Sequence, residues 1–156
     1  MKDKIIKIIK IINIVLLLVC MIGIFLFSSE DRDTSTNTSI ETTKKVVSVV
    51  SNDEDTSTKI AKDYFNEVRK SAHLIEYFCL GILAINVLKD YHKINIWMVL
   101  ICIVFCMLYA LSDEIHQIYV PGRSCELRDI FIDTSGSIIG IIIYSLINFI
   151  YRKRYN

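Results

Sequence analysis

The feature that most constrains this chain is the length of its uncharged apolar stretches. Three of them run for about 17 residues without a charged side chain, and 53% of the 156 residues are hydrophobic. A helix of that length, rising about 1.5 Å per residue, just covers a hydrocarbon core of about 30 Å. The mean hydropathy of +0.43 argues against an ordinary soluble domain, and the net charge of +1 gives no general attraction to nucleic acid. The sequence therefore predicts an integral membrane protein.

Four segments are long and apolar enough to cross a membrane, namely residues 5–27, 72–88, 94–111 and 130–151. Each is expected to be helical, because hydrocarbon offers no water to unpaired backbone groups and the pattern does not fit a closed barrel. The first segment is too long for a signal peptide and has no small-residue cleavage site after it, which indicates an uncleaved anchor. We expect one all-α domain over residues 1–156, an integral membrane bundle of four transmembrane helices.

The distribution of lysine and arginine predicts how the bundle is oriented. Four lysines precede the first span, Lys89 and Lys93 lie between the second and third spans, and three basic residues follow the fourth. Basic residues are enriched in cytoplasmic loops, so both termini are expected in the cytoplasm. Residues 28–71 and 112–129 then lie on the extracytoplasmic side of a multi-pass protein.

The first extracytoplasmic segment contains two amphipathic patterns. Residues 34–43 are rich in Ser, Thr and Asn, a composition typical of mobile segments. Residues 40–50 place Ile40, Thr43, Val47 and Val50 near one helical face with Ser39 as the N-cap, and residues 60–68 repeat this pattern. We expect short amphipathic helices in the outer membrane interface. A disordered surface loop is the alternative.

Ionisable residues at three span ends form the candidate site. The second span begins, the third ends and the fourth begins at the same membrane face, so their side chains can converge in one outward-opening pocket. A charge facing lipid costs about 2.5–3.5 kcal/mol at the bilayer centre, so Glu76 and Asp133, each about one turn inside a span, need partners within the bundle. The Gly136-xxx-Gly140 pair allows a neighbouring helix to approach closely. The residues expected to converge are His73, Glu76, Asp113, His116, Arg123, Asp129 and Asp133.

Two blocks of the sequence resemble a known family. RKSAHLIEYFCLGIL and YALSDEIHQIYVPGRSCELRDIFIDTSGSIIG, with the Phe27-Ser28-Ser29 ending of the first span, are similar to the VanZ-like family, which is named for a determinant of teicoplanin resistance. The resemblance covers nearly the whole chain except residues 30–68. It implies a bacterial cell-membrane protein that contributes to resistance against lipophilic glycopeptides, without an established mechanism. The motif positions that it carries over are His73, Glu76, Asp113, Glu114, His116, Gln117, Arg123, Asp129, Asp133 and Gly136.

Proton transfer at the outer face is the first functional hypothesis. Histidine exchanges protons most readily near neutral pH, and each of the two motif histidines has a carboxylate one helical turn away. Arg123 is able to hold a phosphate or carboxylate head group through two hydrogen bonds. The substrate is then a lipid-linked or cell-wall molecule. The expected catalytic residues are His73, Glu76, Asp113, His116 and Asp129, and the expected substrate-binding residues are Arg123, Glu114, Gln117 and Asp133.

Two non-catalytic functions remain open. The same pocket suits a protein that binds a lipid head group, or the lipoglycopeptide itself, without turnover. The other alternative is a helix-packing subunit of a membrane complex, whose charges complement helix dipoles and tie loops. The sequence contains no HExxH or CxxC motif, so no cofactor is expected. A divalent metal ion on His73, Glu76, Asp113 and His116 is the alternative. The expected partners are the lipid bilayer and one of these ligands, without nucleic acid.

Overall fold

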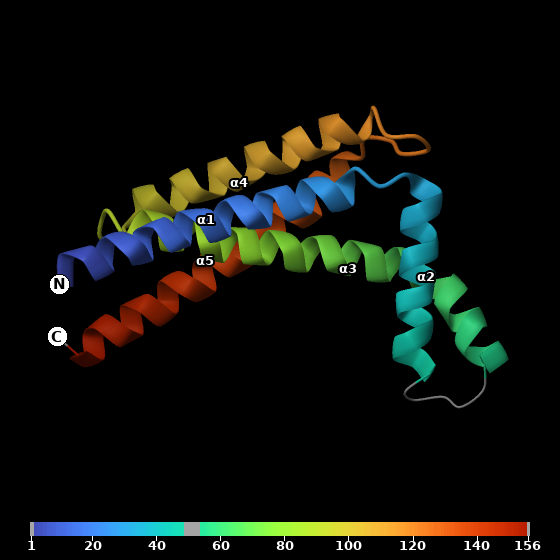
Figure 1. Cartoon of the computed structure of the whole chain (residues 1–156), viewed down its shortest axis with the longest axis horizontal. Coiled ribbons are helices and arrows are strands. Elements are labelled where there is room, and N and C mark those ends of the chain that lie inside the picture. Colours follow the sequence, from blue (N-terminus) through green and yellow to red (C-terminus); the bar gives the residue numbers. More distant parts are fainter. Residues whose placement is uncertain (1, 49–53, 156) are drawn as a thin grey trace.

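α-Helices are the regular elements of this protein. The computed structural model describes residues 2–48 and 54–155, and all the regular secondary structure within them is helical (Figure 1). Four of the helices, α1, α3, α4 and α5, are long and apolar enough to cross a membrane. The predicted all-α bundle with four spans is therefore confirmed. The helices are α1 (Lys2–Ser28), α2 (Arg32–Ser48), α3 (Glu54–Lys89), α4 (Ile96–Gln117) and α5 (Leu127–Tyr155).

The four long helices run alongside one another, and α2 projects from one end of the bundle (Figure 1). α3 packs against each of the other helices, and α5 contacts both α3 and α4. Both termini lie at one end of the bundle with the turn between α3 and α4, whereas α2 and the loop between α4 and α5 lie at the other end (Figure 1). The segments predicted to share a membrane face therefore do lie at the same end.

Glycines bring α3 and α5 close together. A Cβ atom added at Gly136 would lie 2.5 Å from a carbonyl oxygen of α3, and one added at Gly140 would collide with another. Gly81 on α3 makes the reciprocal contact, because its added Cβ would collide with the α5 backbone. This close approach, predicted from the glycine spacing, places Asp133, one turn before the first glycine, against the part of α3 that carries His73.

The segment between the first two spans differs from the prediction. α2 begins at Arg32 and not near Ser39, so the polar residues 34–43, which were expected to be mobile, are helical. Asp31 serves as the N-cap, because its Oδ1 accepts a hydrogen bond of 2.9 Å from the backbone N–H of Thr34. The Asp31 pKa is lowered by the hydrogen bonds from Thr34, so the cap weakens as pH falls through that pKa.

Tertiary packing explains why such a polar segment is helical. Ser35 and Thr43 are buried on α2, and Ser57 and Ala61 are buried on the first part of α3, so small side chains let the two helices lie close together. The second predicted amphipathic helix, residues 60–68, is not separate but belongs to α3 and continues directly into the span. Val50, the last residue of the first predicted amphipathic helix, lies outside the described residues. The location of both helices in the membrane interface stays a prediction.

The predicted orientation of the bundle in the membrane can be tested with one cysteine placed at each end of the bundle. In a background with both exposed native cysteines, Cys79 and Cys125, changed to serine, the variant Thr38→Cys should react with an impermeant maleimide added to intact cells. Tyr91→Cys, at the end that holds both termini, should react only after the cells are broken. Both positions are exposed, so access depends on the side of the membrane alone. The reverse labelling pattern would place both termini outside the cell.

Candidate functional site

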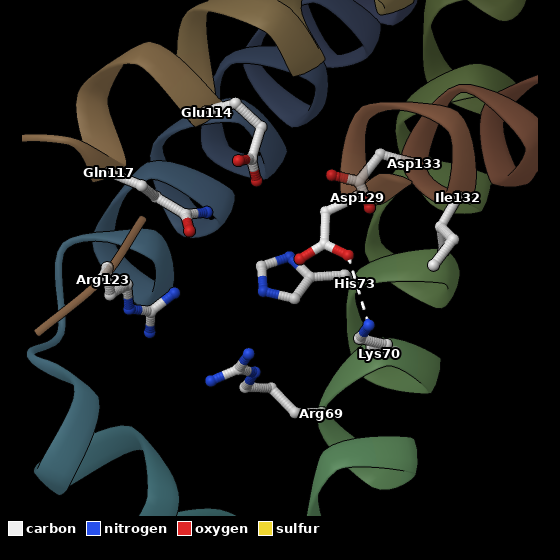
Figure 2. A pocket seen from close by; sticks show the side chains of 9 residues that line it. All are labelled: Arg69, Lys70, His73, Glu114, Gln117, Arg123, Asp129, Ile132 and Asp133. Atoms are coloured by element: carbon white, nitrogen blue, oxygen red, sulfur yellow. Dashed lines mark ion pairs between the residues drawn. The ribbon is translucent and has the colours of Figure 1, made fainter. Parts of the chain in front are cut away.

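The loop between α4 and α5 folds back onto the start of α2. Pro121 and Gly122 form the centre of a turn that is closed by a hydrogen bond from the Arg123 N–H to the Val120 carbonyl, at 3.2 Å. Gly122 has a φ of 74°, which the second central position of a type II turn requires and which glycine adopts without strain. The Arg32 N–H donates to the Pro121 carbonyl at 3.3 Å. The turn is thereby fixed against α2, and it directs Arg123 into the bundle end (Figure 2).

A small polar cavity lies where the middle of α3 meets the end of α4 and the start of α5 (Figure 2). Its volume is about 10 Å³, which is room for about one water molecule. Arg69 and Arg123 point from opposite sides toward the space beside the His73 ring (Figure 2), and Lys70 forms an ion pair with Asp129 at 3.5 Å. The cavity is lined by Arg69, Lys70, His73, Glu114, Gln117, Arg123, Asp129, Ile132 and Asp133.

A larger groove adjoins this cavity on its outer side. The groove has a volume of about 630 Å³ and shares Arg69, Lys70 and Ile132 with the small cavity. Four basic side chains line it against two acidic ones, so its lining carries net positive charge. Arg69 lines two further cavities as well, which makes it the side chain that joins them. The charged residues of the groove are Arg32, Arg69, Lys70, Arg128, Glu67 and Glu126.

Two buried carboxylates and a histidine from three different helices meet behind the cavity. Asp113 on α4 is 3% exposed and Asp133 on α5 is 2% exposed. Gln117 Nε2 donates to Asp113 Oδ2 at 3.3 Å, while Oδ1 of each aspartate has no hydrogen-bond partner in the described part of the chain. One ligand-type atom each from His73, Asp113 and Asp133 lies within 4.8 Å of the other two. The predicted convergence of these three residues is therefore present.

Two further predicted acid–base residues, His116 and Glu76, do not line this cavity, whereas Asp129 does. His116 faces α1, because its ring packs on Phe25 with centroids 4.4 Å apart and its Nε2 lies 3.1 Å from Ser29 Oγ. It does not line the small cavity. The three-residue step leaves the two side chains about 60° apart around the helix axis, and in this structure that offset turns His116 toward α1 while Asp113 faces His73 and Asp133. Glu76 is 3.7 Å from His73 Nδ1 and borders a separate groove near α1 and α2.

Glu114 holds the wall of the site in place. Its side chain is 1% exposed, and its Oε2 accepts a hydrogen bond of 2.8 Å from the backbone N–H of Glu126. This bond fastens the end of the loop to α4. Arg69 and Lys70 line the cavity but were not among the predicted site residues. The four-residue spacing between Arg69 and His73 is the sequence signal that places both on one face of α3.

The fold and the site define a multi-pass membrane protein with a small polar cavity, lined by charges of both signs, beside a basic groove. The family model named VanZ/LLP1 matches residues 13–148, and the chain belongs to this family. Comparison with curated proteins and with solved structures gives no match. The resemblance noted in the sequence is thus confirmed, and membership fits, in broad terms, a role in glycopeptide resistance or in the cell envelope.

Proposed function

We propose that this protein contributes to resistance against lipoglycopeptide antibiotics such as teicoplanin by binding a lipid-linked cell-wall intermediate at the outer face of a bacterial membrane. The recognised group is the phosphate or pyrophosphate head group of that lipid. The observation that carries the proposal is the convergence of Arg69 and Arg123 on one space beside His73 (Figure 2). Guanidinium groups form paired hydrogen bonds with phosphate oxygens, which suits such a site to this ligand.

The electrostatics of Arg123 favour an anion at this place. Its Nε is buried without a hydrogen-bond partner in the described part of the chain, and its Nη2 donates only a long bond of 3.5 Å to the Phe27 carbonyl. Burial, and secondly the charge of Arg69, lower the pKa of Arg123. Arginine nevertheless stays protonated, so two like charges share a poorly solvated space. Three carboxylates offset part of this effect on the pKa of Arg123, namely those of Asp113, Glu30 and Glu114. A bound phosphate would supply the missing acceptors and further negative charge.

The surroundings suit the rest of a lipid molecule. The basic groove of about 630 Å³ provides room for a head group larger than the small inner cavity can take. An apolar cleft of about 500 Å³ continues from it between α3 and α5, sharing Leu74, Arg128 and Ile132. Phe131, which also lines the cleft, is 73% exposed. A head group in the groove and an apolar tail along the cleft together account for both surfaces.

His73 is the residue that we assign to proton exchange if the bound lipid is chemically altered. Its ring lines the cavity next to both arginines, and a neutral imidazole nitrogen can accept a proton or a hydrogen bond from a bound group. Binding without turnover uses the same arginines and leaves His73 as a polar contact. An enzyme and a non-catalytic binding protein therefore use the same head-group site. They differ in whether His73 has to transfer a proton.

The proposal is tested by teicoplanin susceptibility in a sensitive bacterial host that expresses the protein. The variants Arg69→Ala and Arg123→Ala should lose protection, because each removes a donor of the proposed phosphate site. Arg152→Ala is the matched control, since this arginine lies in the last turn of α5 at the opposite end of the bundle. Membrane abundance is measured beside each value. Full protection by an abundant double variant, Arg69→Ala with Arg123→Ala, would contradict the proposal.

A further inference from the structure

Three polar atoms behind the cavity lack a hydrogen-bond partner in the described part of the chain. Oδ1 of Asp113, Oδ1 of Asp133 and Nδ1 of His73 are buried and form no hydrogen bond within residues 2–48 and 54–155. Within the described residues, the ion pair of Lys70 goes to Asp129 and the hydrogen bond to Asp113 comes from the neutral amide of Gln117. A buried carboxylate without compensation is strongly unfavourable in a membrane bundle. These atoms therefore point to a cation that binds among them.

We propose that His73, Asp113 and Asp133 form a binding site for a divalent transition-metal ion, with zinc as the first candidate. One donor atom from each residue lies within 4.8 Å of the other two. Zinc binds imidazole nitrogen and carboxylate oxygen at about 2.0–2.2 Å, so neighbouring ligand atoms of a tetrahedral site lie about 3.3–3.6 Å apart. The three donor atoms need to close by up to about 1.5 Å to meet one ion, which rotation of the side chains can supply.

The charge and the surroundings of the triad fit this ion. Two aspartates and a neutral imidazole balance a charge of +2. The edge of the site carries both signs, because Glu76 Oε2 lies 3.7 Å from His73 Nδ1 while Arg69 and Arg123 line the cavity beside the ring. One imidazole with two carboxylates is a donor set for zinc or manganese and not for a thiolate-seeking metal. His73 and Asp133 also line the cavity that has room for about one water molecule. Three protein ligands beside an open position are typical of a catalytic zinc site.

The site is formed by tertiary structure and not by a sequence motif. Its ligands come from α3, α4 and α5, and the α3–α5 glycine contacts hold two of these helices together. The metal alternative considered from the sequence used Glu76 and His116 together with His73 and Asp113. In the structure Asp133 takes their place beside His73 and Asp113, and His116 faces α1. The inference does not depend on the proposed head-group function, which rests on Arg69 and Arg123.

Metal content of the purified full-length protein tests the inference. Cys79→Ser and Cys125→Ser remove the exposed thiols, which would otherwise bind zinc themselves. The protein is stripped with a chelator, loaded with Zn²⁺, desalted and analysed by elemental mass spectrometry. We expect about one zinc per chain, and a more than about tenfold loss of occupancy in His73→Gln and Asp133→Asn, in line with removal of a metal ligand. Co²⁺ should give visible d–d absorption without thiolate charge-transfer bands.

Two matched substitutions serve as controls. His116→Gln repeats the histidine change on the residue that faces α1, and Asp129→Asn repeats the aspartate change one turn earlier on α5. Both should retain the zinc. The wild-type protein gives a measurement that does not depend on any variant folding, because Zn²⁺ should raise its apparent Tm and a chelator should lower it.

The inference is overturned if the wild-type protein retains neither zinc nor manganese after loading and its Tm does not respond to them. It is also overturned if the ligand variants hold as much metal as the controls, which would show an adventitious ion only. In either case the two aspartates are neutralised by protons instead. Because no lipid or antibiotic is present, these outcomes are independent of the susceptibility results with Arg69 and Arg123.

Discussion

His73→Gln should abolish protection against teicoplanin, whereas His116→Gln should retain most of it. His73 lines the cavity with Arg69 and Arg123 and contributes to the buried triad, so its loss removes a contact that both a binding site and a reaction need. If proton transfer limits the reaction, the loss corresponds to about 10²–10⁴-fold in rate. His116 packs against Phe25 on α1, where glutamine preserves much of the size and some hydrogen bonding.

The measurement compares susceptibility at equal membrane abundance for both histidine variants and for His73→Lys. The lysine variant keeps a positive charge and should also fail, because its ammonium group can neither act as a base near neutral pH nor bind a metal as imidazole does. Loss of protection in His116→Gln together with full protection in His73→Gln would show that the working histidine is the one facing α1. The cavity would then not be the functional site.

Gly140→Leu should prevent the bundle from assembling. Even a Cβ atom at this position collides with the Phe78 carbonyl oxygen of α3, and a backbone oxygen held in a helix has nowhere to move. Overpacking typically costs about 1–3 kcal/mol and occasionally more, and a leucine here forces the backbones of α3 and α5 apart. The separation would also pull Asp133 away from His73, so we expect loss of folded protein as well as loss of function.

Gly23→Leu is the matched control, because a Cβ added at Gly23 on α1 has no neighbouring atom within 4 Å. Monodisperse protein in detergent and its Tm are measured for both variants. Gly140→Ala should show a smaller loss than Gly140→Leu, while Gly23→Leu should resemble the wild type. A wild-type Tm for Gly140→Leu would mean that α3 and α5 do not touch at this position in the membrane.

The number and order of the spans could be predicted from the sequence, because apolar length is a direct requirement of the bilayer. The ends of the helices could not. The third span was expected to stop at Leu111, before the first charged residue, but α4 continues to Gln117. Asp113 and Glu114 are buried within the bundle, so these charges end the apolar stretch without ending the helix.

The convergence of polar side chains was predictable from topology, since three span ends must share a membrane face. The rotation of each helix about its own axis could not be predicted. Because of this rotation, His73 lines the cavity while His116 faces α1. The helical structure of α2 could not be predicted either, because it also depends on tertiary contacts. Its polar sequence is stabilised by the Asp31 cap and by packing on small residues of α3, which local composition does not reveal.

Direct binding of farnesyl pyrophosphate to the purified protein tests head-group recognition most directly. Farnesol, which has the same tail without the pyrophosphate, is the control ligand, and isothermal calorimetry at two salt concentrations is the measurement. We expect saturable binding of the pyrophosphate that weakens at high salt, is absent for farnesol, and disappears in the double variant Arg69→Ala with Arg123→Ala. Equal binding of both ligands, or undiminished pyrophosphate binding by the double variant, would contradict a basic head-group site in this cavity.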